Sequence, residues 1–173
     1  MKLIIYGPPA IGKSSVAREI RMEFGITHIN LGDILRNSGG HGVSIKDALL
    51  EGRLVSDDLV NEIVRKELER RGNCLLDGYP RTIPQAQYLD EITEIDSVLN
   101  LKTSRTADDL FKLITGRRVC PCGEIYNIYV LPPQQEGRCD TCDDMLIERQ
   151  DQQEGTIRRR LDDYFRLTPP VLS

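Results

Sequence analysis

The residues with the clearest chemistry come at the start of the chain. Residues 7–14 read G-P-P-A-I-G-K-S, which matches the phosphate-binding pattern G-x-x-x-x-G-K-[ST]. A short apolar run at residues 3–6 precedes the loop and predicts a strand. The apolar residues after the loop recur on one face of a predicted helix: Val16, Ala17, Ile20 and Phe24. In this setting the loop amides and the helix N-terminus can surround a phosphate, while Lys13 reaches the outer phosphates of a nucleotide.

Asp77 is the second residue that suggests chemistry. It follows the apolar run 74–76, and ligands of parallel α/β sheets bind beyond the carboxyl ends of the strands. A carboxylate at that place can hold Mg²⁺ through water beside the phosphate loop. Arg81 comes four residues later, and its planar guanidinium can bind a phosphate with two hydrogen bonds. Neither His28 nor His41 has a partner in sequence, so we expect no direct chemistry from them.

The elements that must position these residues alternate between strands and helices. Strand-like runs at residues 3–6, 27–31, 74–76 and 97–101 are separated by helical patterns. This order predicts an α/β fold with a parallel sheet and helices on both faces. The helix predicted from residue 32 is interrupted by the glycine-rich residues 38–42. A final helix at 154–167 carries Ile157, Leu161 and Phe165 on one face.

Composition limits the classes of function. The chain has 173 residues, 39% of them hydrophobic, and a net charge of −4, which suits one soluble core with a small insert. It has no long basic tract for nucleic acid or an anionic membrane, and no apolar run of membrane-spanning length. We therefore expect small-molecule partners and no nucleic-acid or membrane partner.

A cysteine cluster lies in the insert at residues 117–150. Cys120 and Cys122 form one pair, and Cys139 and Cys142 form a second pair, with sixteen residues between the two pairs. Four thiolates in two such pairs suit a closed, structural Zn²⁺ site, although the first pair is one residue shorter than the usual spacing. Free thiols or a labile disulfide are the alternative. Clustered cysteines of this kind suit a metal site in a cytoplasmic protein better than they suit a disulfide framework.

The chain resembles the adenylate kinases, and in particular their form with a long, zinc-binding lid. The resemblance rests on residues 7–15, 32–36, 76–82, 116–119 and 149–151, which follow one another in that family's order. It implies a three-layer phosphate-loop kinase core, a helical segment that binds the acceptor nucleotide and a small β-rich lid. The implied parts are the core at 1–29, 60–116 and 153–173, the acceptor segment at 30–59 and the lid at 117–152. The implied reaction is Mg²⁺-dependent transfer of a phosphoryl group from ATP to AMP by a monomer that serves nucleotide biosynthesis.

The resemblance also implies a role for individual residues. The ATP-binding set is Gly7, Pro8, Pro9, Ala10, Ile11, Gly12, Lys13, Ser14, Ser15 and Arg117. The AMP-binding set is Leu31, Arg36, Gly78, Arg81, Gln85, Arg149 and Arg160. The catalytic set is Lys13, Asp77, Arg81, Arg117, Arg149 and Arg160, and Asp151 helps to position the lid arginines. The resemblance further implies that Ser14 and, partly through water, Asp77 bind Mg²⁺.

Several residues depart from the family pattern and leave alternatives open. Asn30 and Leu31 stand where Ser and Thr are usual near the acceptor base, so UMP, CMP or a deoxynucleotide stays a possible acceptor. Ala10 replaces a glycine of the loop. The usual C-terminal strand and helix are apparently lacking. A nucleotide-dependent binding module that uses the four-cysteine ribbon is a further, less favoured alternative.

Overall fold

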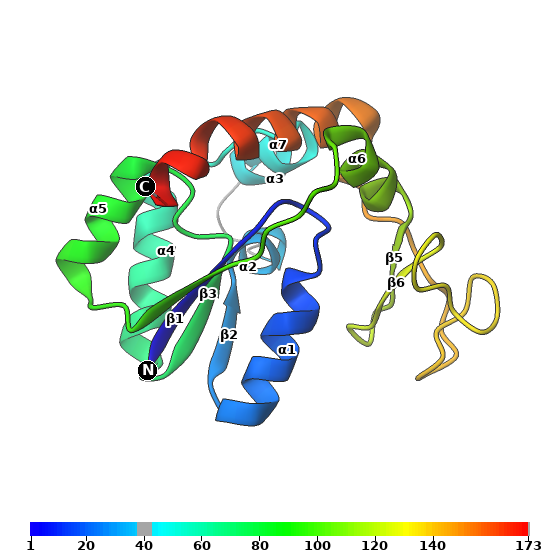
Figure 1. Ribbon diagram of the computed structural model, residues 1–173, viewed down its shortest axis with the longest axis horizontal. Helices are drawn as coiled ribbons and strands as arrows, with labels where there is room; N and C mark the ends of the chain where they lie inside the picture. Colours follow the sequence, from blue (N-terminus) through cyan, green and yellow to red (C-terminus); the bar gives the residue numbers. More distant parts are fainter. Residues whose placement is uncertain (38–42, 173) are drawn as a thin grey trace.

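A parallel four-stranded sheet forms the centre of the protein. In a computed structural model that describes residues 1–37 and 43–172, the strand order is β2-β3-β1-β4 (Figure 1). The strands are β1 (Lys2–Tyr6), β2 (Thr27–Asn30), β3 (Cys74–Asp77) and β4 (Ser97–Asn100). The two central strands are mostly apolar and almost completely buried, as expected for strands covered on both faces. All four predicted strands are therefore confirmed.

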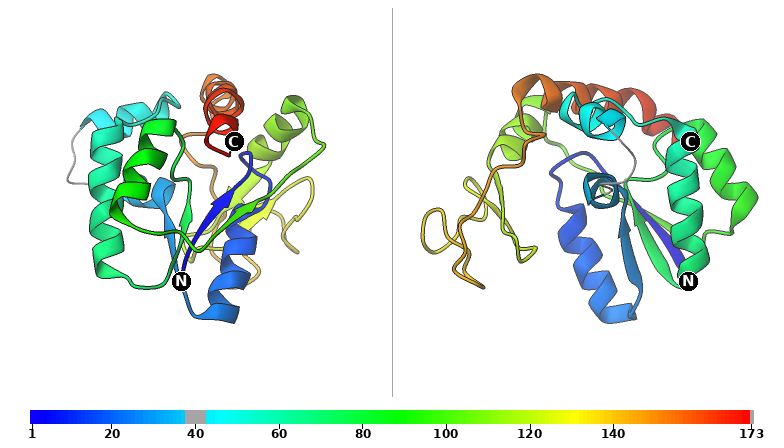
Figure 2. Two further views of the ribbon diagram at one scale, coloured as in Figure 1. Left: turned by 60° about the vertical axis from the view of Figure 1, so that its left-hand side comes forward. Right: turned by 180° about the vertical axis from the view of Figure 1, so that it is seen from behind.

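Helices cover both faces of this sheet, as predicted. The helix α1 (Lys13–Phe24) lies on one face (Figure 2). Its Ala17 packs there with Leu3, Ile5 and Leu75. On the other face, α4 (Asp57–Arg70) and α5 (Ile83–Ile92) pack on a larger core that includes Leu76. The helix α2 (Leu31–Asn37) follows β2 directly, and α3 (Val43–Leu50) precedes α4.

Two further helices lie across the carboxyl ends of the strands. The helix α7 (Glu154–Leu167) runs above the sheet, beside α3 and α6 (Ala107–Thr115), and a short 3₁₀ helix, Pro169–Leu172, follows it (Figure 1). Ile157 and Leu161 of α7 pack with Leu110 and Ile114 of α6. Thr106 and Asp109 form a capping box that fixes the start of α6. These helices close the upper side of the region where the sequence places the ligands.

The insert after α6 is a small β structure that projects to one side of the core (Figure 1). Its strands β5 (Arg117–Val119) and β6 (Ile125–Asn127) pair antiparallel, and single bridges tie in residues 131, 138, 145 and 147. The insert buries only a small cluster made of Cys120, Tyr126 and Cys139. The prediction of a β-rich insert is confirmed.

The helix faces read from spacing are only partly buried. Phe24 and Phe165 were placed on apolar faces, but they are 61% and 48% exposed. The helix α5 was not predicted. The glycine-rich interruption and His41 lie outside the described residues. Among those that are described, no helix combines the length and apolar character needed to cross a membrane.

Candidate active site

A deep cleft of about 410 Å³ opens above the carboxyl ends of the strands. Its walls come from the loop after β1, from α2, from the end of β3, from the insert and from α7. Most of the residues to which the sequence assigned a role line it. The charged ones are Lys13, Arg36, Asp77, Arg81, Arg117, Arg149, Asp151 and Arg160.

The phosphate loop forms one wall of the cleft. Gly7 and Gly12 have φ angles of 148° and 100°, conformations that glycine adopts at little cost. Ala10 also has a positive φ, at 64°. An alanine in this conformation is strained where the glycine usual in the family is not. The helix α1 begins with Lys13 and has no acidic residue in its first turn. Its N-terminal amides are therefore available for an anion.

Lys13 folds back over the loop. Its Nζ donates hydrogen bonds to the carbonyl oxygens of Gly7 and Pro8 at 2.7 and 2.9 Å. Burial lowers the pKa of Lys13 to about 8; nearby Asp77 opposes this shift, and nearby arginines add to it. A lysine held in this way gains favourable interactions when phosphate enters, because the phosphate supplies the missing negative charge.

Asp77 ends β3 and is buried beside the loop. Its Oδ2 atom accepts hydrogen bonds from Asn30 Nδ2 and His28 Nε2, both at 3.1 Å. The parallel pairing of β2 with β3 places Asn30 opposite Asp77. Asn30 was noted only as a departure from the family, and His28 was not expected to act. The register between the strands, which sequence spacing does not reveal, brings them to Asp77.

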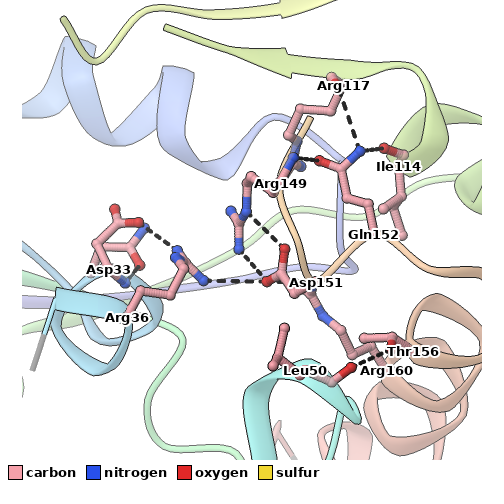
Figure 3. A network of polar contacts seen from close by, with 11 residues as sticks. Asp33, Arg36, Leu50, Ile114, Arg117, Arg149, Asp151, Gln152, Thr156 and Arg160 are labelled. Atoms are coloured by element: carbon pink, nitrogen blue, oxygen red, sulfur yellow. Dashed lines mark hydrogen bonds and ion pairs between the residues drawn. The ribbon is translucent and has the colours of Figure 1, made fainter. Parts of the chain in front are cut away.

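Arginines from three parts of the chain meet around Asp151. Its carboxylate lies 3.3 Å from Arg160 and 3.6 Å from Arg36, and accepts two hydrogen bonds from Arg149 (Figure 3). Burial favours a higher pKa for Asp151, but Arg149, Arg160 and Arg36 together hold it below its usual value. Asp151 thus acts as the counter-charge for the arginine cluster.

Burial and mutual repulsion affect the arginines themselves. Burial, together with the charge of Arg149, lowers the pKa of Arg117 to about 10. Burial and neighbouring arginines lower that of Arg160 to about 10 as well, although Asp151 opposes the shift. Burial also lowers the pKa of Arg81. Several partly buried cations facing one cleft make a strong site for a polyanion.

Two residues of the predicted AMP-binding set do not line the cleft. Leu31 is the first residue of α2, is 3% exposed and packs in the main core. Gln85 is also buried, and its Oε1 accepts a hydrogen bond from the backbone N–H of Arg81 at 2.7 Å. Its Nε2 donates to Asp57 Oδ1 at 2.6 Å. Gln85 therefore supports Arg81 here, and its contact with an acceptor base stays a prediction.

A contact that the sequence analysis missed joins the two ends of the insert. The side-chain amide of Gln152 donates to the carbonyl oxygens of Ile114 at 3.1 Å and of Arg117 at 3.4 Å (Figure 3). These contacts tie the chain entering the insert to the chain leaving it. Gln152 lies in a short polar run that has no motif of its own, so nothing in its spacing points to this role.

The four cysteines of the insert come together. The sulfurs of Cys120, Cys122, Cys139 and Cys142 all lie within 4.8 Å of one another. The two closest pairs are at 3.4 and 3.6 Å. A tetrahedron of thiolates around zinc, with bonds of about 2.3 Å, has sulfur–sulfur edges of about 3.8 Å. The residues therefore fit a metal, in spite of the short first pair.

One thiol of this cluster is already acidified by the protein. A hydrogen bond from the Tyr126 hydroxyl is the largest of the effects that lower the pKa of Cys139 to about 6. The same hydroxyl accepts from the backbone N–H of Asp140 at 2.8 Å. A thiolate is the form that binds metal ions.

Comparison with known proteins decides the family. Residues 5–173 match the family model described as adenylate kinase. The chain belongs to the adenylate kinase family. It is 40% identical over 182 residues to "Adenylate kinase" of Petrotoga mobilis, an alignment that covers 99% of this chain and 84% of the relative. It is 41% identical over 186 residues to that of Carboxydothermus hydrogenoformans, with 99% and 85% covered.

Family membership gives the class of reaction. The protein is a nucleoside monophosphate kinase that transfers a phosphoryl group from ATP to AMP and yields two ADP. This assignment confirms the predicted fold class and activity, and it favours the enzyme over the binding module. The chain's own geometry agrees, because a phosphate loop and a set of arginines face one cleft.

Proposed function

We propose that this kinase acts by bringing two nucleotides together in the cleft, with the roles of its residues divided by wall. Lys13 and the loop at residues 7–15 bind the phosphates of ATP. Arg36 and Arg81 bind the phosphate of AMP from the opposite wall. Arg117, Arg149 and Arg160 contact the phosphoryl group that moves between them. The observation that carries this proposal is the convergence of these cations, most of them partly buried, on one cleft above the phosphate loop.

The chemistry asked of the protein is mainly electrostatic. Phosphoryl transfer needs the attacking and leaving oxygens held in line and the negative charge of the transferring group compensated. Arginines supply fixed hydrogen-bond donors for this purpose, and Asp151 holds three of them ready in the absence of phosphate. We propose that incoming phosphate replaces Asp151 as a partner of these arginines.

Magnesium has a fitting place beside the loop. Ser14 and Asp77 line the same cleft and offer a hydroxyl and a carboxylate, the oxygen ligands that Mg²⁺ prefers. When bound with ATP, the ion compensates charge on the phosphate oxygens. Asp77 would hold its water ligands in place, and Ser14 would bind it more directly.

The insert at residues 117–152 is proposed as a zinc-stapled lid, and residues 30–59 as the acceptor-binding segment. The remaining residues, 1–29, 60–116 and 153–173, form the core. A lid that buries so small a cluster needs a metal to hold its fold. Closing over the nucleotides excludes water, which otherwise accepts the phosphoryl group. We propose a monomer acting in the cytoplasm, where its thiols stay reduced.

A panel of acceptors tests the choice of nucleotide. ADP formation from ATP is measured with AMP, dAMP, GMP, CMP or UMP as the second substrate. We expect the highest kcat/KM with AMP, since the fold and motifs are those of adenylate kinases. A pyrimidine nucleotide that outran AMP would overturn the adenine assignment and favour the alternative acceptor that Asn30 and Leu31 kept open.

A further inference from the structure

The carboxylate of Asp77 is held asymmetrically. Both of its side-chain hydrogen bonds, from His28 Nε2 and from Asn30 Nδ2, go to the same oxygen, Oδ2. Within residues 1–37 and 43–172, Oδ1 receives no hydrogen bond. An ionised carboxylate only accepts hydrogen bonds, so His28 contributes its Nε2–H here. The two oxygens of Asp77 therefore have different environments.

The strand register explains why both donors reach one oxygen. Asn30 lies opposite Asp77 in the parallel β2–β3 ladder, and His28 lies opposite Leu75. Residues two apart on a strand point to the same face of the sheet, so His28 and Asn30 share the face of Asp77. The side chain of His28 is 19% exposed and that of Asp77 is 5% exposed. Because both side chains are largely buried, water can supply few of the hydrogen bonds that Asp77 receives from these donors.

Asn30 also links Asp77 to the helix that follows. Its Oδ1 accepts a hydrogen bond from the backbone N–H of Asp33 at 3.0 Å, in the first turn of α2. This contact fixes the amide of Asn30 with its Nδ2 directed at the carboxylate. The same helix carries Arg36. The orientation of Asp77 is thus tied to the start of a helix that lines the cleft.

Without these two donors, nearby cations would compete for the carboxylate of Asp77. Lys13 and Arg81 lie near enough for their charges to interact with it, and Lys13 is one of the groups that line the cleft. A carboxylate free to rotate would turn toward these cations. Instead, the Lys13 ammonium binds loop carbonyls. The donors on Oδ2 keep the carboxylate in its place between the strand and the loop.

We infer that His28 and Asn30 are positioning residues for magnesium: they occupy Oδ2 of Asp77 and so leave Oδ1 to bind the water ligands of the ion. The inference rests on the proposed role of Asp77. A buried carboxylate could receive two donors merely to satisfy its charge. The positioning role differs from that one in a measurable way, because it predicts an effect on magnesium and not on nucleotide.

The test compares ATP binding with and without Mg²⁺ by calorimetry. For His28→Leu we expect the Mg²⁺-dependent gain in ATP affinity to fall by roughly tenfold, a typical loss for a residue behind a metal ligand. Affinity for metal-free ATP should stay within about twofold, since the phosphate loop is untouched. His28→Gln restores a donor and should recover most of the gain. Asn30→Leu loses the donor without adding a charge, and should behave like His28→Leu.

Asp77→Asn separates failure of this inference from failure of the proposed function. If Asp77 serves magnesium, Asp77→Asn loses the Mg²⁺-dependent gain, and adding His28→Leu to it changes nothing further. If Asp77→Asn keeps the gain, the proposed role of Asp77 fails. If Asp77→Asn loses it while His28→Leu and Asn30→Leu keep the wild-type gain, the positioning role is overturned. Should His28→Leu not fold, His28→Gln against Asn30→Leu carries the same comparison. Arg65→Gln, at an exposed ion pair on α4, serves as the unchanged control.

Discussion

At the scale of single residues, the charged side chains of the site are paired with other groups of the protein, and we expect nucleotide phosphates to replace these partners. Lys13 binds carbonyl oxygens and the arginines share Asp151. Burial and the neighbouring charges shift the pKa values of Lys13, Asp151 and Arg160 from their usual values. Two predictions follow from the directions of these shifts.

The first concerns Lys13 and pH. Its pKa of about 8 in the free protein should rise when ATP phosphates replace the loop carbonyls as partners. Between these two pKa values binding takes up a proton, so ATP affinity should fall as the pH rises above about 8. Calorimetry at pH 9 in buffers of different ionisation enthalpy measures the uptake. Lys13→Arg, which stays charged, should show none; equal proton uptake by both proteins would contradict the assignment.

The second concerns Asp151. Replacing it with Asn leaves buried arginines without their counter-charge, and should lower the free energy of unfolding by about 3 kcal/mol. Because its pKa lies below the usual 3.8, the difference should be full above about pH 4 and should shrink as the pH falls further. Sulfate should restore part of the stability by binding the arginines. Denaturant unfolding with and without sulfate checks this, and an Asp151→Asn protein as stable as the wild type would contradict it.

The sequence reveals residues whose role is tied to a motif and misses those whose role depends on register. Lys13 and Asp77 could be found because a loop pattern and a strand end announce them. His28 could not, since its partner lies 49 positions away and only the β2–β3 pairing brings them together. Gln152 escaped notice for the same reason, because its partners belong to the far end of the insert.

At the scale of elements, the lid is the part least able to hold itself. It has two three-residue strands and a small buried cluster in which two of the members are cysteines. The core sheet, in contrast, is buried on both faces by separate apolar clusters. We therefore expect the insert to be less stable than the core sheet.

Metal removal tests this inequality. The purified protein should carry about one zinc per chain. Chelation, or Cys122→Ser, should make residues 117–152 sensitive to protease while the sheet core stays folded. Metal analysis, limited proteolysis and thermal unfolding measure the three effects. Glu136→Gln, at an exposed lid position, is the control. A metal-free lid that resists protease as well as the wild type would contradict the structural role of zinc.

Elements were predicted well where local pattern and tertiary packing agree. The spacing of apolar residues located α1 and α7, and buried Ala17, Ile157 and Leu161 confirm their inner faces. Phe24 and Phe165 share that spacing but remain largely exposed, because burial depends on what packs opposite and not on periodicity alone. The helix α5 begins at Ile83 after the N-cap Thr82, whose hydroxyl accepts from the Gln85 N–H; the T-x-x-Q spacing and Pro84 are a start signal that the sequence analysis missed.

At the scale of the whole molecule, the cleft lies between the parts that the proposed closure moves relative to one another. Asp151 and Arg36 already connect the insert with α2, and Thr156 of α7 donates to the carbonyl of Leu50 at 2.5 Å. Binding of both nucleotides should strengthen these connections through the shared phosphates. Closure is thus expected to involve the lid and the acceptor segment together.

Amide hydrogen exchange measures that closure. A bisubstrate compound with two adenosines joined by phosphates should slow exchange in residues 117–152 and 30–59, with little change at β1 and β3. AMP alone should protect mainly residues 30–59. Equal protection across the whole chain would indicate general stabilisation and would contradict closure of two separate segments.

The central claim is that this chain transfers phosphoryl groups from ATP to AMP through the arginines of the cleft. The most direct measurement is a coupled assay of ADP formed from ATP and AMP with Mg²⁺, comparing the wild type with Arg81→Ala and with Arg65→Ala. Arg81 is partly buried and lines the cleft, whereas Arg65 lies on the exposed surface of α4. We predict turnover by the wild type and Arg65→Ala, and a loss on the order of 10³ for Arg81→Ala at unchanged thermal stability. Absence of turnover in the wild type, or full activity in Arg81→Ala, would contradict the claim.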